Sequence, residues 1–586
     1  MAIKTKKSKI KIRKTPSPEQ LQIREQRLQK KSFQGLLSKL GFHQLATDGI
    51  EFIFCDRTGE IDDLFIFENI LLITEYTVGK PNSYSAHLLK KKVLYDKILA
   101  DINGFIALCR TIYPNFNETL DSLYDASSCQ IKILYVTKSE PSDELMTNCP
   151  DIHFIYGASE KYFQALIKTI EGSARIEFLK SLGLEYFQVG KAALQTSHES
   201  ITYQGFLLPE RNSSYPDGYK IVSFYADPER LITKGYVLRR DSWRDESHLY
   251  QRILIAKKIK QMRHYLVEEG RVFVNNVIVT LPPETILNEP NNTGKNIDSS
   301  ELGKVRSVSV QIPAGFSTIG IIDGQHRIFC YHEGSDRAEI EISKLRQQQN
   351  LMVTGIIYPP NTSDIVRRSF EAKLFLEIND NQTSARSSLK QDIEVIIRPY
   401  SGIAIAKRIV QELGRRGPLK GMLQTSYFDS PNKIKTSSIV SYGLRPLVKL
   451  DGKDSLYFSW ENVEKLKLKE IDYNNRTSLL EEYIDYCTKK INELIVEVKL
   501  AKGNSSWDID ESPRNELLSP TAINGLFVCL RQIISSEQTL TSEAHKRKLK
   551  SIDKLEFSSF KSSQWQRLGT KLFDEHYESD QGMSAN

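Results

Sequence analysis

Residues 319–331 read Ile-Gly-Ile-Ile-Asp-Gly-Gln-His-Arg-Ile-Phe-Cys-Tyr, two apolar runs separated by five polar or glycine residues. This order predicts a strand, a tight turn at Gly324 and a helix. The backbone N–H groups at the helix start, the helix dipole and the Arg327 guanidinium together would form an anion site that suits phosphate. His326 adds a donor or a proton-transfer group that titrates near neutral pH. The alternative is a helix capped by Asp323 with a surface His and Arg, but five such residues in succession favour a site.

A family resemblance enters at these residues. The segment from Phe316 to Phe329 resembles the signature of the DGQHR-domain family, a branch of the ParB/sulfiredoxin-like superfamily whose DndB-like members accompany bacterial DNA modification such as phosphorothioation. Further similar segments follow the family's order and extend the resemblance over residues 200–395: Tyr250-Gln251-Arg252, Phe273-Val274-Asn275-Asn276, Phe375-Leu376-Glu377-Ile378-Asn379 and Asn381-Gln382-Thr383.

The resemblance implies a central ParB/sulfiredoxin-like domain that binds ATP or CTP. Gln325 stands where sulfiredoxin-like proteins carry their redox cysteine, so sulfinic-acid reduction is not expected. Arg252 shares a helical face with Ile255 and Ile259 in a helix expected from Glu246 to Glu269; it would reach the pocket or pair with an acidic side chain. The residues expected to bind nucleotide or phosphate are Asp323, Gly324, Gln325, His326, Arg327, Arg252, Asn379 and Gln382, of which Asn379 and Gln382 could equally organise a turn.

The composition of the chain limits the class of protein and the cellular compartment to be expected. The chain has 586 residues and ordinary apolar and charged fractions for a globular protein of two to four domains. No apolar stretch approaches the length of a membrane span, and the Lys-rich N-terminus lacks the apolar core of a signal peptide. Seven cysteines lie far apart without a Cys-x-x-Cys pair, which predicts reduced thiols in a cytoplasmic protein.

Positive charge is concentrated at the N-terminus. Residues 1–31 contain eleven Lys or Arg against Glu19 and Glu25, whereas the net charge of the whole chain is only +7. A basic tail over residues 1–16 can neutralise DNA phosphates without reading sequence, and its contact residues would be Lys6, Lys7, Lys9, Lys11 and Arg13. The alternative is a solvated N-terminus without a partner.

The pattern along the chain predicts an α/β (α+β) protein with three regions. Residues 17–184 read as a helix, three strands (50–55, 63–67 and 70–77), a helix over 83–113 and further strands near 131–137 and 152–156. That order resembles the restriction-endonuclease-like PD-(D/E)xK core. Residues 200–395 form the DGQHR (ParB-like) domain, in which the polar stretch 288–300 would lie near the site mouth. Residues 396–586 are helical, with an apolar seam that more often marks a packed core than a partner surface: Leu480, Ile484, Cys487, Ile491, Leu494 and Val498.

A nuclease site is a second hypothesis. Asp62 and Glu75 resemble the carboxylates that hold a divalent metal in PD-(D/E)xK enzymes, and two carboxylates suit Mg²⁺. Thr77 occupies the position of the usual lysine. Lys90, or its neighbours Lys91 and Lys92, would supply the ammonium instead. Without it the domain would be nuclease-like but inert, and the two acids would be exposed carboxylates at hairpin ends.

These features predict a DNA-binding protein of a bacterial DNA-modification or defence system, in which the DGQHR site acts as a regulator or accessory factor. The alternative is a Mg-dependent DNA nuclease gated by the DGQHR domain. Nucleotide hydrolysis at the turn stays open, as do contacts with DNA-modification or defence proteins and homo-oligomerisation. No membrane contact is expected.

Overall fold

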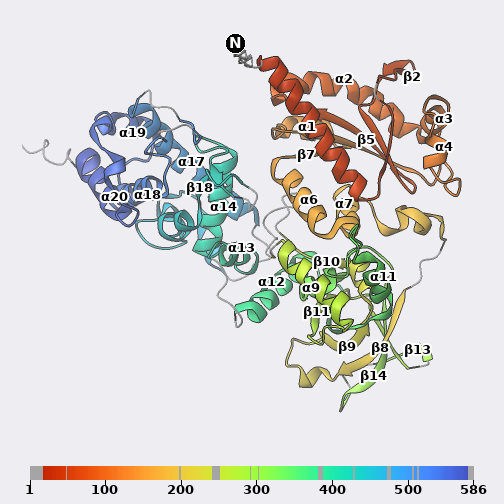
Figure 1. Cartoon of the computed structure of the whole chain (residues 1–586). Coiled ribbons are helices and arrows are strands. Elements are labelled where there is room, and N and C mark those ends of the chain that lie inside the picture. The colour runs from red at the N-terminus through yellow and green to blue at the C-terminus, as the bar shows by residue number, and fades with distance from the viewer. Residues whose placement is uncertain are drawn as a thin grey trace, which may run out of the picture.

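The computed structural model has a mixed α/β architecture, as the sequence predicts. Two larger sheets and a set of C-terminal helices follow one another along the chain (Figure 1). It describes residues 17–47, 49–196, 200–239, 251, 253–290, 292–297, 299–300, 302–380, 387–425, 429–470, 477–503, 507–510 and 514–578. The basic tail therefore lies outside the described residues. No helix in the described part combines the length and apolar composition needed to cross a bilayer.

The N-terminal region is built on a mixed sheet with the order β1-β4-β5-β6-β7. β4 pairs antiparallel with both β1 and β5, whereas β5, β6 and β7 are parallel to one another. Its elements are α1 (Pro18–Lys39), β1 (His43–Leu45), β2 (Phe52–Phe54), β3 (Arg57–Gly59), β4 (Asp63–Phe67), β5 (Ile70–Thr77), α2 (Pro81–Ala100), α3 (Ile102–Ile112), α4 (Phe116–Thr119), β6 (Gln130–Thr137), α5 (Asp143–Asn148), β7 (Ile152–Tyr156), α6 (Gly157–Ile170) and α7 (Arg175–Ser181).

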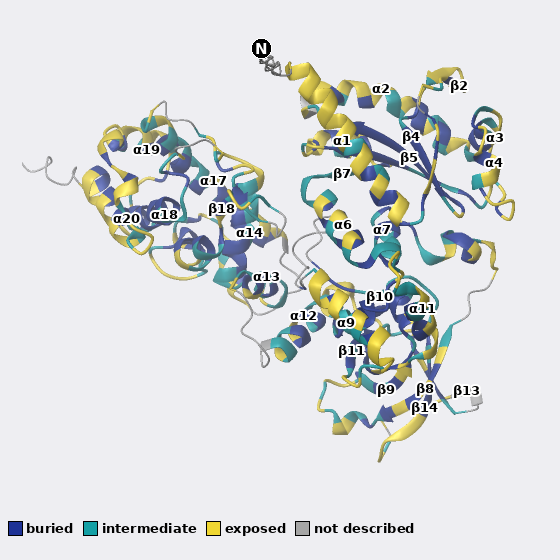
Figure 2. Cartoon of the chain, in the orientation of Figure 1, coloured by how far each residue is buried: buried dark blue, intermediate teal, exposed yellow. Residues whose placement is uncertain are grey.

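Two local predictions in this region need correction. The strand expected over 50–55 is β2, which pairs with β3 in a separate hairpin, and β1 takes its place beside β4. The single helix expected over 83–113 is two helices, because the backbone leaves the helical conformation at Asp101, whose side chain accepts a hydrogen bond from the Gly104 N–H at 2.8 Å. The hairpin that joins β4 to β5 is present as predicted. Both of these strands are buried between helices (Figure 2).

The central region contains a larger sheet with the order β10-β15-β11-β16-β9-β8-β14-β12-β13. The chain traces these elements: β8 (Ile201–Leu208), β9 (Lys220–Ala226), α8 (Pro228–Lys234), β10 (Gly235–Tyr236), α9 (Ala256–Glu269), β11 (Val277–Leu281), β12 (Ile286–Glu289), β13 (Asn292–Asn296), β14 (Arg306–Ile312), β15 (Ile319–Asp323), α10 (Gln325–Phe329), α11 (Glu339–Gln348), β16 (Leu351–Ile357) and α12 (Asp364–Asp380).

The five-residue turn lies at the end of β15, near one edge of this sheet. The polar stretch 288–300, which was expected near the turn, forms much of β12 and β13 at the opposite edge, so that prediction is wrong. The helix expected from Glu246 begins only at Ala256. Before it, Gln251 forms an isolated bridge with Arg239.

One hydrophobic core runs through the N-terminal and central regions. It includes Leu37 of α1, Leu166 of α6, Phe178 of α7 and, from the central sheet, Val279 and Ile321, each almost fully buried. In Figure 1, α6 and α7 lie between the two sheets. The two regions are therefore packed against each other through a common apolar interior.

The C-terminal region has its own hydrophobic core. All six residues of the apolar seam on α17 are buried in it, so the seam is internal packing rather than an open partner surface. The elements are α13 (Ser387–Ile397), α14 (Gly402–Arg415), β17 (Leu423–Gln424), β18 (Ile434–Lys435), α15 (Arg445–Val448), α16 (Leu456–Ser459), α17 (Thr477–Ala501), α18 (Pro520–Ser535), α19 (Ser542–Lys548) and α20 (Trp565–Phe573).

Candidate functional site

Asp62 and Glu75 meet across the β4–β5 pair. Asp63 pairs with Thr74, so Asp62, one residue earlier, lies opposite Glu75 and on the same face of the sheet. Asp62 Oδ2 accepts a hydrogen bond from the Tyr76 backbone N–H at 3.1 Å, which fixes this carboxylate beside β5. The two carboxylates are close enough for the charge of Asp62 to raise the pKa of Glu75.

A lysine from α2 completes this group. Lys91 Nζ donates to Glu75 Oε2 in an ion pair. Lys90, the residue selected from the sequence, is exposed and makes no such bond, and Lys92 instead pairs with Asp96 at 2.7 Å. The ammonium therefore comes from Lys91 rather than Lys90, because successive residues on a helix point in different directions.

The environment of Glu75 disfavours the charged form of its carboxyl group. Its side chain is 3% exposed, and burial, followed by the neighbouring charge of Asp62, raises its pKa to about 7 although Lys91 acts to lower it. Glu75 Oε1 is buried without a hydrogen-bond partner of normal geometry among the described residues. A cation bound beside Glu75 would stabilise the ionised form of this carboxylate.

Two further residues near Glu75 and Lys91 were not predicted from the sequence. His87 and Tyr95 share the α2 face of Lys91 through a spacing of four residues. The pKa of His87 is lowered by burial and by Lys91 but raised by Asp62, and the Tyr95 phenol lowers the pKa of Glu75. The spacing of residues 87, 91 and 95 is the signal that could have identified this face.

The group fits a divalent cation of the magnesium type. Such ions prefer one or two carboxylates and complete their shell with water or substrate phosphate oxygens. Asp62 and Glu75 supply two carboxylates, and Glu75 Oε1 has no hydrogen-bond partner of normal geometry among the described residues. Within the described residues no cluster of three or more His, Cys, Asp or Glu gathers in metal-binding geometry, so these two acids would act as a pair.

On the opposite face of the sheet, the side chain of Asp63 ties the start of β4 to α1 and β1. Asp63, 2% exposed, accepts hydrogen bonds from Gln34 at 3.0 Å and Gln44 at 2.7 Å. Lys30 of α1 lies 3.7 Å from the Asp63 carboxylate and donates to the Asp62 carbonyl at 3.1 Å. These contacts position Asp62 through its own backbone.

The five-residue turn has the predicted backbone but a different use of its charges. Gly324 has φ +97°, a conformation that favours glycine, and starts α10. Arg327 donates to Asp323 at 2.7 Å and to the Asn276 carbonyl at 2.8 Å. Asp323 therefore orients Arg327 and does not cap the helix. Nη2 of Arg327 binds both protein oxygens, whereas its Nε is buried without a hydrogen-bond partner among the described residues.

His326 and Gln325 are also tied to neighbouring elements. The Ile255 backbone N–H donates to His326 Nε2 at 3.1 Å, and burial with three nearby cations lowers the pKa of His326 to about 4. Arg239, 1% exposed, donates from Nε to Gln325 at 3.1 Å and from Nη1 to Glu177 of α7 at 2.6 Å. The turn thus contacts the end of the N-terminal region.

Of the other residues expected at this site, Asn379 alone lies among the described residues. Asn379 donates to the Phe375 carbonyl at 2.8 Å within α12. Arg252 and Gln382 lie outside the described residues, as do all five candidate DNA contacts of the basic tail. Since α10 has only five residues, its dipole adds little to an anion site.

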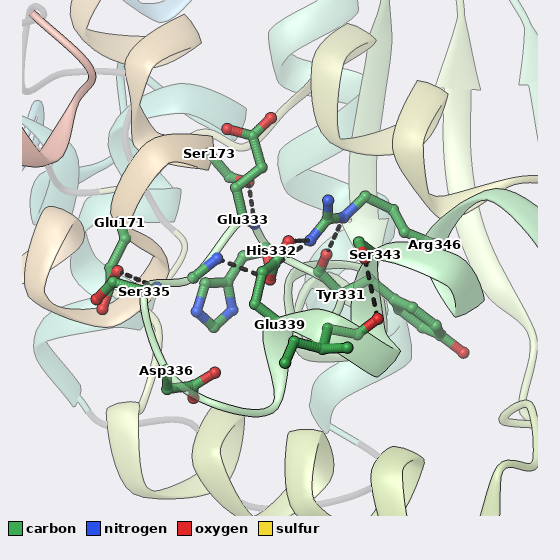
Figure 3. A network of polar contacts seen from close by, with 12 residues as sticks. Glu171, Ser173, Tyr331, His332, Glu333, Ser335, Asp336, Glu339, Ser343 and Arg346 are labelled. Carbon is green, nitrogen blue, oxygen red and sulfur yellow. Dashed lines mark hydrogen bonds and ion pairs between the residues drawn. The ribbon is translucent and has the colours of Figure 1, made fainter.

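A network of polar contacts holds the loop that follows the turn (Figure 3). Arg346 donates to the carbonyls of Tyr331 and His332 at 2.5 and 2.9 Å, and pairs with Glu339 at 2.6 Å. The same loop contacts the N-terminal region, because the Ser335 N–H donates to Glu171 at 2.7 Å and the Glu333 N–H donates to Ser173 at 2.9 Å.

Comparison with family models, curated proteins and solved structures found no match to this chain.

Proposed function

We propose that this protein is a metal-dependent DNA nuclease whose active site is formed by Asp62, Glu75 and Lys91. The observation that carries the proposal is the convergence of two carboxylates and an ammonium on one face of the β4–β5 pair. The strand order around them resembles the restriction-endonuclease-like core, in which a lysine can move to a neighbouring helix.

Each residue has a role that its position supports. Asp62 and Glu75 would hold the cation, which when bound supplies charge neutralisation and a more acidic water. Lys91 places a positive charge where a phosphodiester gains negative charge during attack, and such a charge is most effective in a buried site. Asp63 is a positioning residue, since it fixes the chain segment that carries Asp62.

In this proposal the central region recognises DNA or gates cleavage. Arg239 joins the five-residue turn to α7, so the turn is coupled to the nuclease-like region by a buried ion pair. The resemblance to DGQHR-domain proteins supports a role in DNA modification or defence. An accessory DNA-binding role without cleavage is the competing function.

The test is cleavage of supercoiled plasmid DNA, unmodified and phosphorothioated, by the full chain with Mg²⁺ or with a chelator. We expect Mg-dependent nicking or linearisation, which Glu75→Gln abolishes while keeping the shape of the side chain. Asp96→Asn, a change to an exposed acid on α2, is the matched control and should cleave normally. DNA binding without cleavage of either plasmid would support the accessory role instead.

A second measurement separates metal binding from turnover. Mg²⁺ should raise the Tm of the wild-type chain by mass action and leave the Tm of Glu75→Gln unchanged. Equal shifts in the two proteins would show that the cation binds elsewhere.

A further inference from the structure

A cleft of about 430 Å³ opens at the start of β15, the end of the strand opposite to the five-residue turn. α7, β10, β11 and α12 contribute to it, together with the segments that precede β15 and follow β16. Its size is within the range of small-molecule sites. The cleft is separate from the Asp62–Glu75–Lys91 group, none of whose residues lines it.

The floor of the cleft is a buried polar cluster. Glu371 of α12, 1% exposed, accepts hydrogen bonds from Tyr236 and Thr280, both at 2.6 Å, and from Tyr358 at 2.9 Å. Gly320 of β15 leaves room for this cluster, because a Cβ there would lie only 2.7 Å from the Tyr236 hydroxyl and 2.8 Å from Glu371. The close packing of the β15 backbone against these polar side chains fixes the shape of the cleft floor.

Cations line the mouth of the cleft. Lys180 comes from α7, and Arg367 and Arg368 come from the first turn of α12. Arg367 pairs with Asp364 and Lys180 pairs with Glu185, whereas Arg368 is half-buried without a hydrogen-bond or ion-pair partner among the described residues. The lining therefore has three cationic side chains against the two acids Asp364 and Glu371, a positive balance, and burial also raises the pKa of Glu371.

The segment before β15 carries two further signs of a ligand site. Ser317 has φ +55°, a left-handed conformation that is costly for a residue with a Cβ. Such conformations concentrate at functional sites. The hydroxyl of the next residue, Thr318, is buried without a hydrogen-bond partner among the described residues. An unmatched hydroxyl beside unpaired positive charge suits an anionic group.

We propose that this cleft binds a nucleoside phosphate. Arginine guanidinium groups match phosphate oxygens in geometry and charge, and the Thr318 hydroxyl adds a neutral donor. Leu238, Leu281 and Pro282 form the apolar part of the lining, which suits a base or sugar.

A ligand bound in the cleft would contact both α7 and α12. Lys180 belongs to α7, the same helix whose Glu177 binds Arg239, while both arginines belong to α12. A phosphate group that contacts both sides would join the end of the N-terminal region to the helix that leads towards the C-terminal region. Binding itself does not depend on the nuclease proposal.

The experiment measures binding of ATP, CTP, adenosine and inorganic phosphate to the full chain by calorimetry. We expect ATP or CTP to bind at least ten-fold more tightly than adenosine or inorganic phosphate. Arg368→Ala and the isosteric Thr318→Val should weaken that binding, the former by ten-fold or more. Lys373→Ala, which removes an exposed cation on the same helix, should bind as wild type.

Further variants make the result decisive. Arg327→Ala should retain nucleotide binding, and Glu75→Gln should retain it even if cleavage is lost, so the two proposals can fail separately. Loss of binding in Arg327→Ala with normal binding in Arg368→Ala would return the nucleotide to the five-residue turn and overturn the proposal. Absence of ATP and CTP binding, or equal affinity for inorganic phosphate, would also overturn it.

Discussion

The β4–β5 pair and the five-residue turn both bring carboxylate and cationic side chains together, but their electrostatic balance differs. At the turn, Nη2 of Arg327 has two protein acceptors and the ring nitrogen of His326 accepts a backbone N–H, while Arg327 Nε is buried without a partner among the described residues. At the β4–β5 pair, one carboxylate raises the pKa of the other, and Glu75 Oε1 has no normal partner among the described residues.

The difference lies in what surrounds each charge. The polar residues of the turn link β15 to the start of α9 and, through Arg239, to α7. The acidic pair is less recognisable in sequence, yet burial and Asp62 raise the pKa of Glu75, and strongly shifted pKa values are common at functional sites. The following changes test that contrast.

The largest expected effect is on catalysis. Lys91→Ala should lower the rate of Mg-dependent DNA cleavage by about 100-fold or more, because one preorganised charge at a reacting phosphate is worth that much. Lys90→Ala removes an adjacent exposed lysine and should change the rate little. Cleavage rates of the two variants at saturating Mg²⁺ provide the comparison, and equal losses would contradict the assignment of Lys91.

The next effect is the pH dependence of stability. The folded pKa of Glu75 is about 7 against 4.5 unperturbed, so between these values the folded chain holds a proton that the unfolded chain has released. This contribution is full below about pH 4.5 and is lost as pH rises through 7, at a cost of up to about 3 kcal/mol. Glu75→Gln should therefore flatten the fall in the free energy of unfolding over this window, measured by urea denaturation at a series of pH values. An unchanged slope would show that Glu75 is ionised throughout.

A smaller effect is expected at the turn. Arg327→Ala should lower the free energy of unfolding by about 2 kcal/mol, since it removes charge-assisted hydrogen bonds and leaves Asp323 without its partner. Arg306→Ala, at an exposed ion pair with Glu289, should cost less than about 1 kcal/mol. Equal urea midpoints for Arg327→Ala and wild type would mean that the turn does not depend on this arginine.

The smallest effect concerns the basic tail. Deletion of residues 1–14 removes seven positive charges and should make the salt dependence of DNA affinity shallower. Fluorescence anisotropy with duplex DNA over a range of salt concentrations measures that slope. Identical slopes for the full and truncated chains would show that the tail does not contact phosphate.

Local patterns predicted much of the fold correctly. Alternating and apolar runs located β4, β5 and β15, and Gly324 located the turn, because these signals depend on neighbouring residues. The sequence failed where long-range pairing decides the outcome. The polar stretch 288–300 extends the far edge of the sheet, and β2 leaves the main sheet for a hairpin with β3.

The sequence allowed the two acids and the presence of a nearby lysine to be predicted, but not which lysine it is. The strand positions of Asp62 and Glu75 follow from the hairpin that joins β4 to β5, so their proximity could be inferred. The choice between Lys90 and Lys91 depends on the rotation of α2 about its axis, which tertiary packing sets. The partners of Arg327 were hidden for the same reason, because Asn276 lies in a distant segment.

The common core of the N-terminal and central regions limits how this protein can be divided or exchanged. A fragment that ends near residue 184 would expose the apolar faces of α6 and α7 to water, and a fragment that starts there would expose the matching surface of the central sheet. Neither piece is then a self-sufficient unit that recombination could transfer intact to another protein. The two regions would melt in one transition and be inherited together. The C-terminal helices from α14 onwards have a core of their own and could be replaced more independently, whereas α13 packs on the central region through Leu389 and Ile393.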